Sequence, residues 1–193
     1  MKKTSRNIIT AVFAAISYAA IHFLLRYGLG FLPDIRPWEG FEYSIGNTNY
    51  GLIDIIYFIF GLVLFVHGAI RLFGISKQNH KAQNMETRKP EFLLTDGYYS
   101  KVRHPMYGTF MLIQTGLLIS LRSGIGIVLA VIIVAAQYFN GIIEENNQLI
   151  KIFGTEYEEY MSRVTNRYLT PCMRLYYIFA FILTVSGYVF GIL

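Results

Sequence analysis

The chain alternates long apolar stretches with shorter polar ones, and this pattern predicts membrane-spanning helices. Five apolar stretches are evident, at residues 8–25, 51–72, 106–121, 124–139 and 175–193. A helix of 18 residues is about 27 Å long, close to the ~30 Å hydrocarbon core of a bilayer. The stretches lack the alternation of barrel strands, and unpaired backbone groups are costly in lipid. We therefore predict an all-α integral membrane protein with about five transmembrane helices.

The third and fourth stretches are short for a bilayer, and only Arg122, Ser123 and Gly124 join them. This spacing predicts a helical hairpin over residues 105–140 with a tight turn at the membrane face. Each helix gains length by continuing past the hydrocarbon edge at its other end. A cleaved signal peptide is the alternative for the first stretch, but its apolar run is long for one and no small-x-small site ends it.

We predict a single domain, residues 1–193, in three parts. The first holds two transmembrane helices, the second holds the hairpin between two polar stretches, and the third is the last helix. These parts cover residues 1–75, 76–173 and 174–193. The polar stretches, 76–104 and 140–173, flank the hairpin on one side of the membrane, so they can meet.

The placement of Lys and Arg predicts the orientation in the membrane. Of the 17 Lys and Arg residues, only Arg26, Arg36 and Arg122 lie on the side opposite the N-terminus and the two polar stretches. Because basic loops stay in the cytoplasm, we expect the N-terminus and both polar stretches there. The net charge of +5 then follows from topology and anionic headgroups, and implies no nucleic acid partner.

The second polar stretch has helical periodicity of its own. Its apolar residues predict that the fourth transmembrane helix continues to Gly154. Thr155 followed by Glu158 fits a capping box, which predicts a second short helix through about Arg163.

Arg103, His104 and Pro105, with Tyr107 just after them, form the first candidate constellation. Pro suits the first turn of a helix and Arg reaches for headgroups, so an interface anchor is one interpretation. The helix start also offers unpaired backbone donors that suit a carboxylate or phosphate.

Glu144 and Glu145 form the second constellation, at the cytoplasmic end of an apolar helix. Acidic residues there oppose both the helix dipole and the positive-inside bias. Adjacent helical residues diverge by about 100°, so we expect one of the two to face a site shared with Arg103 and His104.

The other candidates are weaker. Asp54, His67 and Arg71 are ionisable residues in or near the second span, where a functional role competes with a structural one. The single cysteine, Cys172, excludes an internal disulfide. The sequence has no metal-ligand spacing, nucleotide-binding loop or nucleophile elbow, so we predict no metal.

The run TDGYYSKVRHPMYGTF, the hairpin, and then EENNQLIKIFGTEYEEYMSRVTNRYLTP resemble the isoprenylcysteine carboxyl methyltransferase and phospholipid methyltransferase superfamily. The resemblance covers about residues 83–171 and combines G-x-Y, R-H-P-x-Y, E-E and F-G-x-x-Y-x-x-Y in order. It implies an integral membrane enzyme that uses S-adenosyl-L-methionine and releases S-adenosyl-L-homocysteine. The cofactor-binding residues that it implies are Gln83, Leu93, Leu94, Tyr99, His104, Pro105, Met106, Tyr107 and Glu145, with Glu144 as the less favoured carboxylate. The catalytic candidates are Glu145, Arg103 and Arg163.

One departure from the superfamily concerns the methyl acceptor. Eukaryotic prenylcysteine enzymes have arginines just before the acidic pair, whereas this chain has Asn140 and Gly141. Arg163, Arg167 and Arg71 are the alternatives for binding a substrate carboxylate.

The resemblance favours methyl transfer to a lipophilic, prenylcysteine-like carboxylate from the membrane. A sulfonium methyl is already activated, so such an enzyme mainly aligns donor and nucleophile, and a carboxylate needs no general base. The alternatives are a phospholipid N-methyltransferase, a small-thiol S-methyltransferase, a sterol-reductase-like enzyme with a nicotinamide cofactor, and a non-enzymatic lipid-binding bundle. The sequence sets no oligomeric state.

Overall fold

The computed structural model describes residues 3–30, 34–38, 44–45, 48–49, 51–82 and 91–191, and these are helical apart from loops and one small hairpin. The helices are α1 (Lys3–Leu29), α2 (Leu52–Ala82), α3 (Pro105–Ile119), α4 (Gly124–Glu144), the π-helical turn η1 (Glu145–Leu149), α5 (Ile150–Phe153), α6 (Thr155–Arg163) and α7 (Pro171–Gly191). Strands β1 (Ser44–Ile45) and β2 (Thr48–Asn49) pair antiparallel. The all-α fold class is confirmed.

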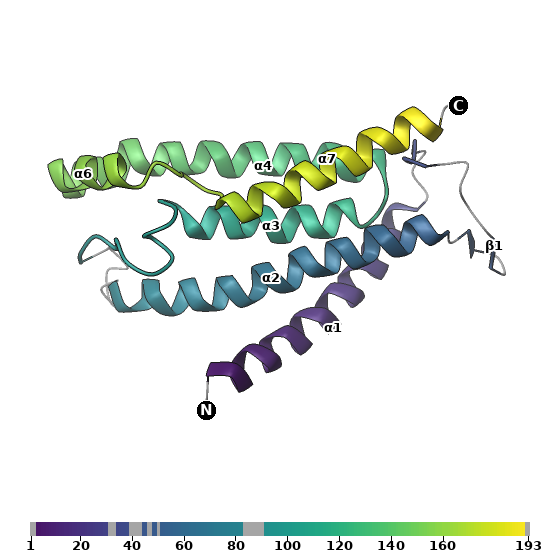
Figure 1. Ribbon diagram of the computed structural model, residues 1–193, viewed down its shortest axis with the longest axis horizontal. Coiled ribbons are helices and arrows are strands. Elements are labelled where there is room, and N and C mark those ends of the chain that lie inside the picture. The colour runs from purple at the N-terminus through teal and green to yellow at the C-terminus, as the bar shows by residue number, and fades with distance from the viewer. Residues whose placement is uncertain are drawn as a thin grey trace.

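The long helices form an elongated bundle (Figure 1). Helices α2, α3 and α4 lie side by side, α1 packs against α2, and α7 crosses the bundle obliquely. By length and composition, four described helices can cross a bilayer: α1, α2, α7, and α4 with its continuation to Phe153. The chain is a multi-pass integral membrane protein.

The predicted third span is the short helix α3, which lies in the middle of the bundle. Nine of its 15 residues are buried. A Cβ on Gly61 of α2 would lie 2.4 Å from the carbonyl oxygen of Gly116, so the two backbones approach closely where neither residue has a side chain. Because protein rather than lipid surrounds much of α3, its length need not match the full hydrocarbon thickness.

The observed helix bounds differ from the predicted ones in α2, and the observed N-cap of α6 corrects the predicted capping box. Helix α2 continues ten residues past the predicted end at residue 72, while the fourth helix continues to Phe153 as expected. Helix α6 has the predicted bounds, but the predicted capping box is wrong. Thr155 is the first helical residue, and Gly154, with φ of 51°, takes the N-cap position without a side-chain hydrogen bond.

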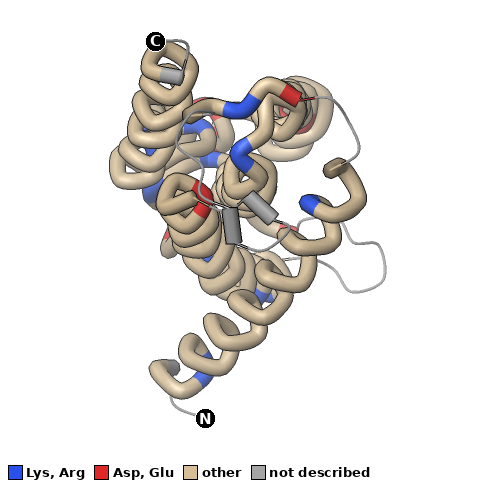
Figure 2. The backbone as a smooth tube through the Cα atoms, turned by 90° about the vertical axis from the view of Figure 1, so that its right-hand side faces the viewer, with Lys and Arg blue, Asp and Glu red and all other residues tan. Residues whose placement is uncertain are grey.

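A buried ion cluster joins α1, α2 and the hairpin turn at the end of the bundle where α2 begins. Figure 2 views the molecule from this end. The Oδ1 atom of Asp54 lies 3.1 Å from Nη1 of Arg26 and 3.3 Å from Nε of Arg122. The backbone N–H of Gly51 donates to the other oxygen, Oδ2. The turn is closed as predicted, with Ser123 Oγ accepting from the N–H of Gly126. These contacts give Asp54 a structural role.

Gly108 of α3 provides a test of how the segment before α7 packs on the bundle. A Cβ on Gly108 would lie 2.0 Å from the carbonyl oxygen of Tyr168. Gly108→Ala is therefore expected to lower the free energy of unfolding by about 1–3 kcal/mol, as overpacking does. Thermal unfolding in detergent measures this, with Gly28→Ala as the control because a Cβ there meets nothing within 4 Å. Equal stability of Gly108→Ala and the wild type would contradict the close approach.

Candidate functional site

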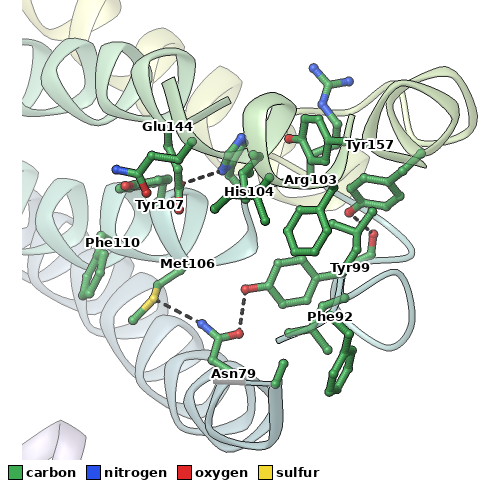
Figure 3. A pocket seen from close by; sticks show the side chains of 18 residues that line it. Asn79, Phe92, Tyr99, Arg103, His104, Met106, Tyr107, Phe110, Glu144 and Tyr157 are labelled. Carbon is green, nitrogen blue, oxygen red and sulfur yellow. Dashed lines mark hydrogen bonds and ion pairs between the residues drawn. The ribbon is translucent and has the colours of Figure 1, made fainter. Parts of the chain in front are cut away.

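A cavity of about 430 Å³ lies at the opposite end of the bundle, where α2 ends and α3 begins (Figure 3). Four parts of the chain build its wall. They contribute Asn79 and Ala82 from α2; Phe92, Leu93, Leu94, Tyr99, Arg103 and His104 from the segment before α3; Met106, Tyr107 and Phe110 from α3; and Glu144, Gln148, Leu149, Ile152, Phe153, Tyr157 and Tyr160 from α4 to α6. The wall thus combines aromatic rings with charged and amide side chains.

The N-terminus of α3 opens onto this cavity. Pro105 is the first helical residue, and His104 at the N-cap makes no side-chain capping bond. The N–H groups of Met106 and Tyr107 come too early in the helix to have an intrahelical acceptor, so they can donate to a ligand. Backbone hydrogen bonds from the N–H groups of residues 103 and 104 to the carbonyls of Asn166 and Arg167 fix this helix start.

Glu145 is a buried carboxylate that joins three segments of the chain. Its Oε1 atom lies 2.8 Å from Arg103 Nε and 3.0 Å from His104 Nε2, and it accepts a 3.2 Å hydrogen bond from the Tyr157 hydroxyl. Its Oε2 atom lies 2.9 Å from Arg167 Nη2. Because these four partners occupy the carboxylate, Glu145 does not line the cavity, although it was the carboxylate favoured as the cofactor ligand.

Glu144 is the acidic residue that faces the cavity. Its side chain is 33% exposed, and its Oε2 atom lies 3.2 Å from Nδ1 of His104. The adjacent Glu145 does not line the cavity, although both carboxylates contact His104.

His104 is held between the two carboxylates through both ring nitrogens. Burial acts to lower the pKa of His104, but the hydrogen bonds and negative charges of Glu144 and Glu145 outweigh burial and raise the pKa above its ordinary value. In the protonated ring both nitrogens are donors. His104 therefore has no free lone pair with which to accept a proton.

A π-helical turn, η1, begins at Glu145. The N–H of Ile150 bonds to the carbonyl of Glu145 five residues earlier, which widens the helix by one residue. Glu144 and Gln148, which are four residues apart, face the cavity, whereas Glu145 is buried. Single π-turns inside α-helices are frequent at functional sites.

A chain of hydrogen bonds lines the α2 side of the cavity (Figure 3). The Tyr99 hydroxyl donates to Asn79 Oδ1 at 2.6 Å, and Asn79 Nδ2 lies 3.6 Å from the sulfur of Met106. The Tyr160 hydroxyl donates to the carbonyl of Tyr99 at 2.7 Å. Burial raises the pKa of Tyr99 to about 12, so its hydroxyl stays neutral.

The structure brings many of the predicted residues together. Leu93, Leu94, Tyr99, Arg103, His104, Met106, Tyr107 and Glu144 line the cavity. Pro105 is the buried first residue of α3. Arg163 is exposed at the end of α6 and does not line the cavity. Gln83 lies outside the described residues. Sequence reasoning missed Asn79, Ala82, Phe92, Phe110, Gln148, Leu149, Ile152, Phe153, Tyr157 and Tyr160 as wall residues. Of these, Tyr157 and Tyr160 carried a signal in their three-residue spacing.

Comparison with known proteins agrees with this geometry. The phospholipid methyltransferase family profile matches residues 56–156, which run from α2 into α6 and include most of the cavity wall. The chain is also 30% identical over 171 residues to Protein-S-isoprenylcysteine O-methyltransferase of Xenopus laevis; the match covers 83% of this chain and 57% of that protein. This chain belongs to the phospholipid methyltransferase family, whose methyl donor is S-adenosylmethionine.

Glu145→Gln tests whether the buried carboxylate holds this end of the molecule together. The substitution leaves the guanidinium groups of Arg103 and Arg167 without their anion and leaves His104 with Glu144 alone, so we expect a loss of about 3–5 kcal/mol in the free energy of unfolding. Chemical unfolding in detergent measures the loss, and Glu156→Gln on the exposed face of α6 is the matched control. A stability loss no larger than that of the control would show that the network carries little energy.

Proposed function

We propose that this chain is an S-adenosylmethionine-dependent methyltransferase that methylates a lipophilic acceptor in the cavity beside α3. The cavity volume lies within the 300–1,000 Å³ of small-molecule sites. The cofactor, when bound, supplies an activated methyl group on a sulfonium. The residues of the chain then have to bind the cofactor, orient the acceptor and exclude water.

The cavity wall offers a partner for each part of this cofactor. The rings of Tyr99, Phe92 and Phe110 suit stacking on adenine or a cation–π contact with the sulfonium. The exposed part of Glu144 suits hydroxyl or ammonium donors. Arg103 and the free N–H groups at the start of α3 suit a carboxylate.

We infer that the acceptor is a carboxylate, as in a prenylcysteine. The observation that carries this inference is the His104 imidazole, whose nitrogens are both bonded to glutamates. Burial also raises the pKa of Tyr99 and of Tyr157, so neither is a base near neutral pH. Among the described wall residues, Glu144 is the remaining proton acceptor, and it is paired with His104. A carboxylate is ionised above about pH 5 and needs no base, whereas a phospholipid amine or a thiol does.

Arg167 is the cation that we assign to the acceptor carboxylate. A Cβ on Gly141 would lie 2.5 Å from the Tyr168 ring, so an arginine at that position would displace the ring. Arg167 comes from the segment beside Tyr168, is 31% exposed and uses Nη2 for Glu145. Arg163, like Arg167, lies outside the cavity wall, but it is exposed and has no ion pair to Glu145.

The proposed location suits a reaction between a charged cofactor and a membrane-bound acceptor. The cavity lies where apolar helices meet polar segments, and the distribution of Lys and Arg supports a cytoplasmic position for this end. The isoprenylcysteine enzyme among its relatives supports the same class of acceptor.

Labelled methyl transfer to a short S-prenylcysteine tests the acceptor. We expect a base-labile methyl ester and a kcat/KM that stays flat between about pH 6 and 9, because the acceptor carboxylate is ionised throughout. The matched control is the same compound with its carboxyl group blocked as an amide, which should give no product.

A base-stable product together with a rate that rises with pH through the pKa of an amine or thiol would contradict carboxyl methylation. That result would favour phospholipid N-methylation or thiol S-methylation at the same site.

A further inference from the structure

The seam between α2 and α7, on the face of the bundle away from the cavity wall, carries a second group of polar side chains. The rings of Phe60 and Phe179 lie 4.9 Å apart between their centroids. Towards the cavity end of the bundle, Nδ1 of His67 lies 3.3 Å from the hydroxyl of Tyr176. Arg71 follows one turn further along α2, on the same face as His67. The seam therefore changes from aromatic to polar to cationic along its length.

Arg71 differs from Arg103 and Arg122 because it has no anionic partner among the described residues. Arg103 pairs with Glu145 and Arg122 with Asp54, but no carboxylate in the described part of the chain pairs with Arg71. Its Nε is buried without a hydrogen-bond partner. Its guanidinium carbon lies 5.3 Å from the ring centroid of Tyr98, which provides an aromatic backing and no negative charge. A guanidinium stays charged at any physiological pH, so this position favours an anionic ligand.

The depth of Arg71 identifies the source of that anion. Arg71 follows Leu52, the first residue of α2, by 19 positions, which is about 28 Å along the helix axis. This length is close to the ~30 Å hydrocarbon thickness, so Arg71 reaches the level of the headgroups. Leu175 and Phe179 of α7 are exposed beside the seam, as expected for a lipid-facing surface.

We propose that the α2–α7 seam binds one anionic phospholipid. The phosphate accepts hydrogen bonds from the Arg71 guanidinium, the His67–Tyr176 pair contacts the phosphate or the first ester group, and an acyl chain lies along Phe60 and Phe179. Basic positions between transmembrane helices at this depth are suited to phosphate headgroups. The seam site shares none of these five residues with the cavity wall.

Native mass spectrometry of the detergent-purified full chain tests the proposal with phosphatidylglycerol and phosphatidylcholine as probes. The wild type is expected to retain one phosphatidylglycerol with about tenfold preference, and Arg71→Gln is expected to lose that preference, as removal of one charge-assisted interaction implies. Lys77→Gln is the matched control, because Lys77 is an exposed cation on the same helix and should leave the preference unchanged.

A second variant and a cofactor-binding measurement distinguish loss of lipid binding at the seam from misfolding and from damage to the cavity. Tyr176→Phe keeps the ring packing and removes only the hydroxyl, so it should weaken phosphatidylglycerol retention severalfold even if Arg71→Gln fails to fold. Both variants, when folded, should bind S-adenosylhomocysteine like the wild type. Equal retention of the two lipids by the wild type, an unchanged preference in Arg71→Gln, or unchanged phosphatidylglycerol retention in Tyr176→Phe would overturn the proposal. Displacement of the lipid by millimolar inorganic phosphate would overturn the lipid assignment in favour of a soluble anion.

Discussion

The cavity end of this molecule depends on a single buried carboxylate, that of Glu145. A charge that is removed from water must be paired and hydrogen-bonded, and Glu145 meets this requirement with Arg103, His104, Tyr157 and Arg167. These partners come from the segment before α3, from α6, and from the segment before α7. The pairing therefore fixes three otherwise separate pieces of chain against η1, and with them the start of α3 and much of the cavity wall.

The same arrangement shapes the chemistry that the site supports. Glu145 is buried at the start of the π-helical turn, Glu144 lines the cavity, and His104 is bonded to both. A histidine with a carboxylate at each ring nitrogen has neither nitrogen free to accept a proton from a substrate. In our proposal the cavity binds and aligns its ligands without a free proton acceptor, which suits methyl transfer to a group that is already ionised.

Much of this was predictable from the sequence, because lipid requires long apolar helices and because R-H-P-x-Y and E-E are distinctive. What the sequence did not predict arises from three-dimensional contacts. The apolar stretch that predicts α2 ends at residue 72, but the helix itself continues to Ala82. This polar continuation brings Asn79 to the cavity. The capping box failed because Gly154 supplies the turn by its backbone conformation. The choice between Glu144 and Glu145 needed the long-range contacts of Glu145 with Arg103 and Arg167, which no local pattern of residue types marks.

Titration calorimetry with S-adenosylhomocysteine is the most direct test of the central claim that the cavity beside α3 is a methyltransferase cofactor site. The detergent-purified wild type should bind it saturably, Glu144→Gln should bind about tenfold more weakly through loss of one charged hydrogen-bond acceptor, and a nicotinamide dinucleotide should give no signal. Absence of binding in protein shown to be folded, or binding of the nicotinamide dinucleotide alone, would contradict the account.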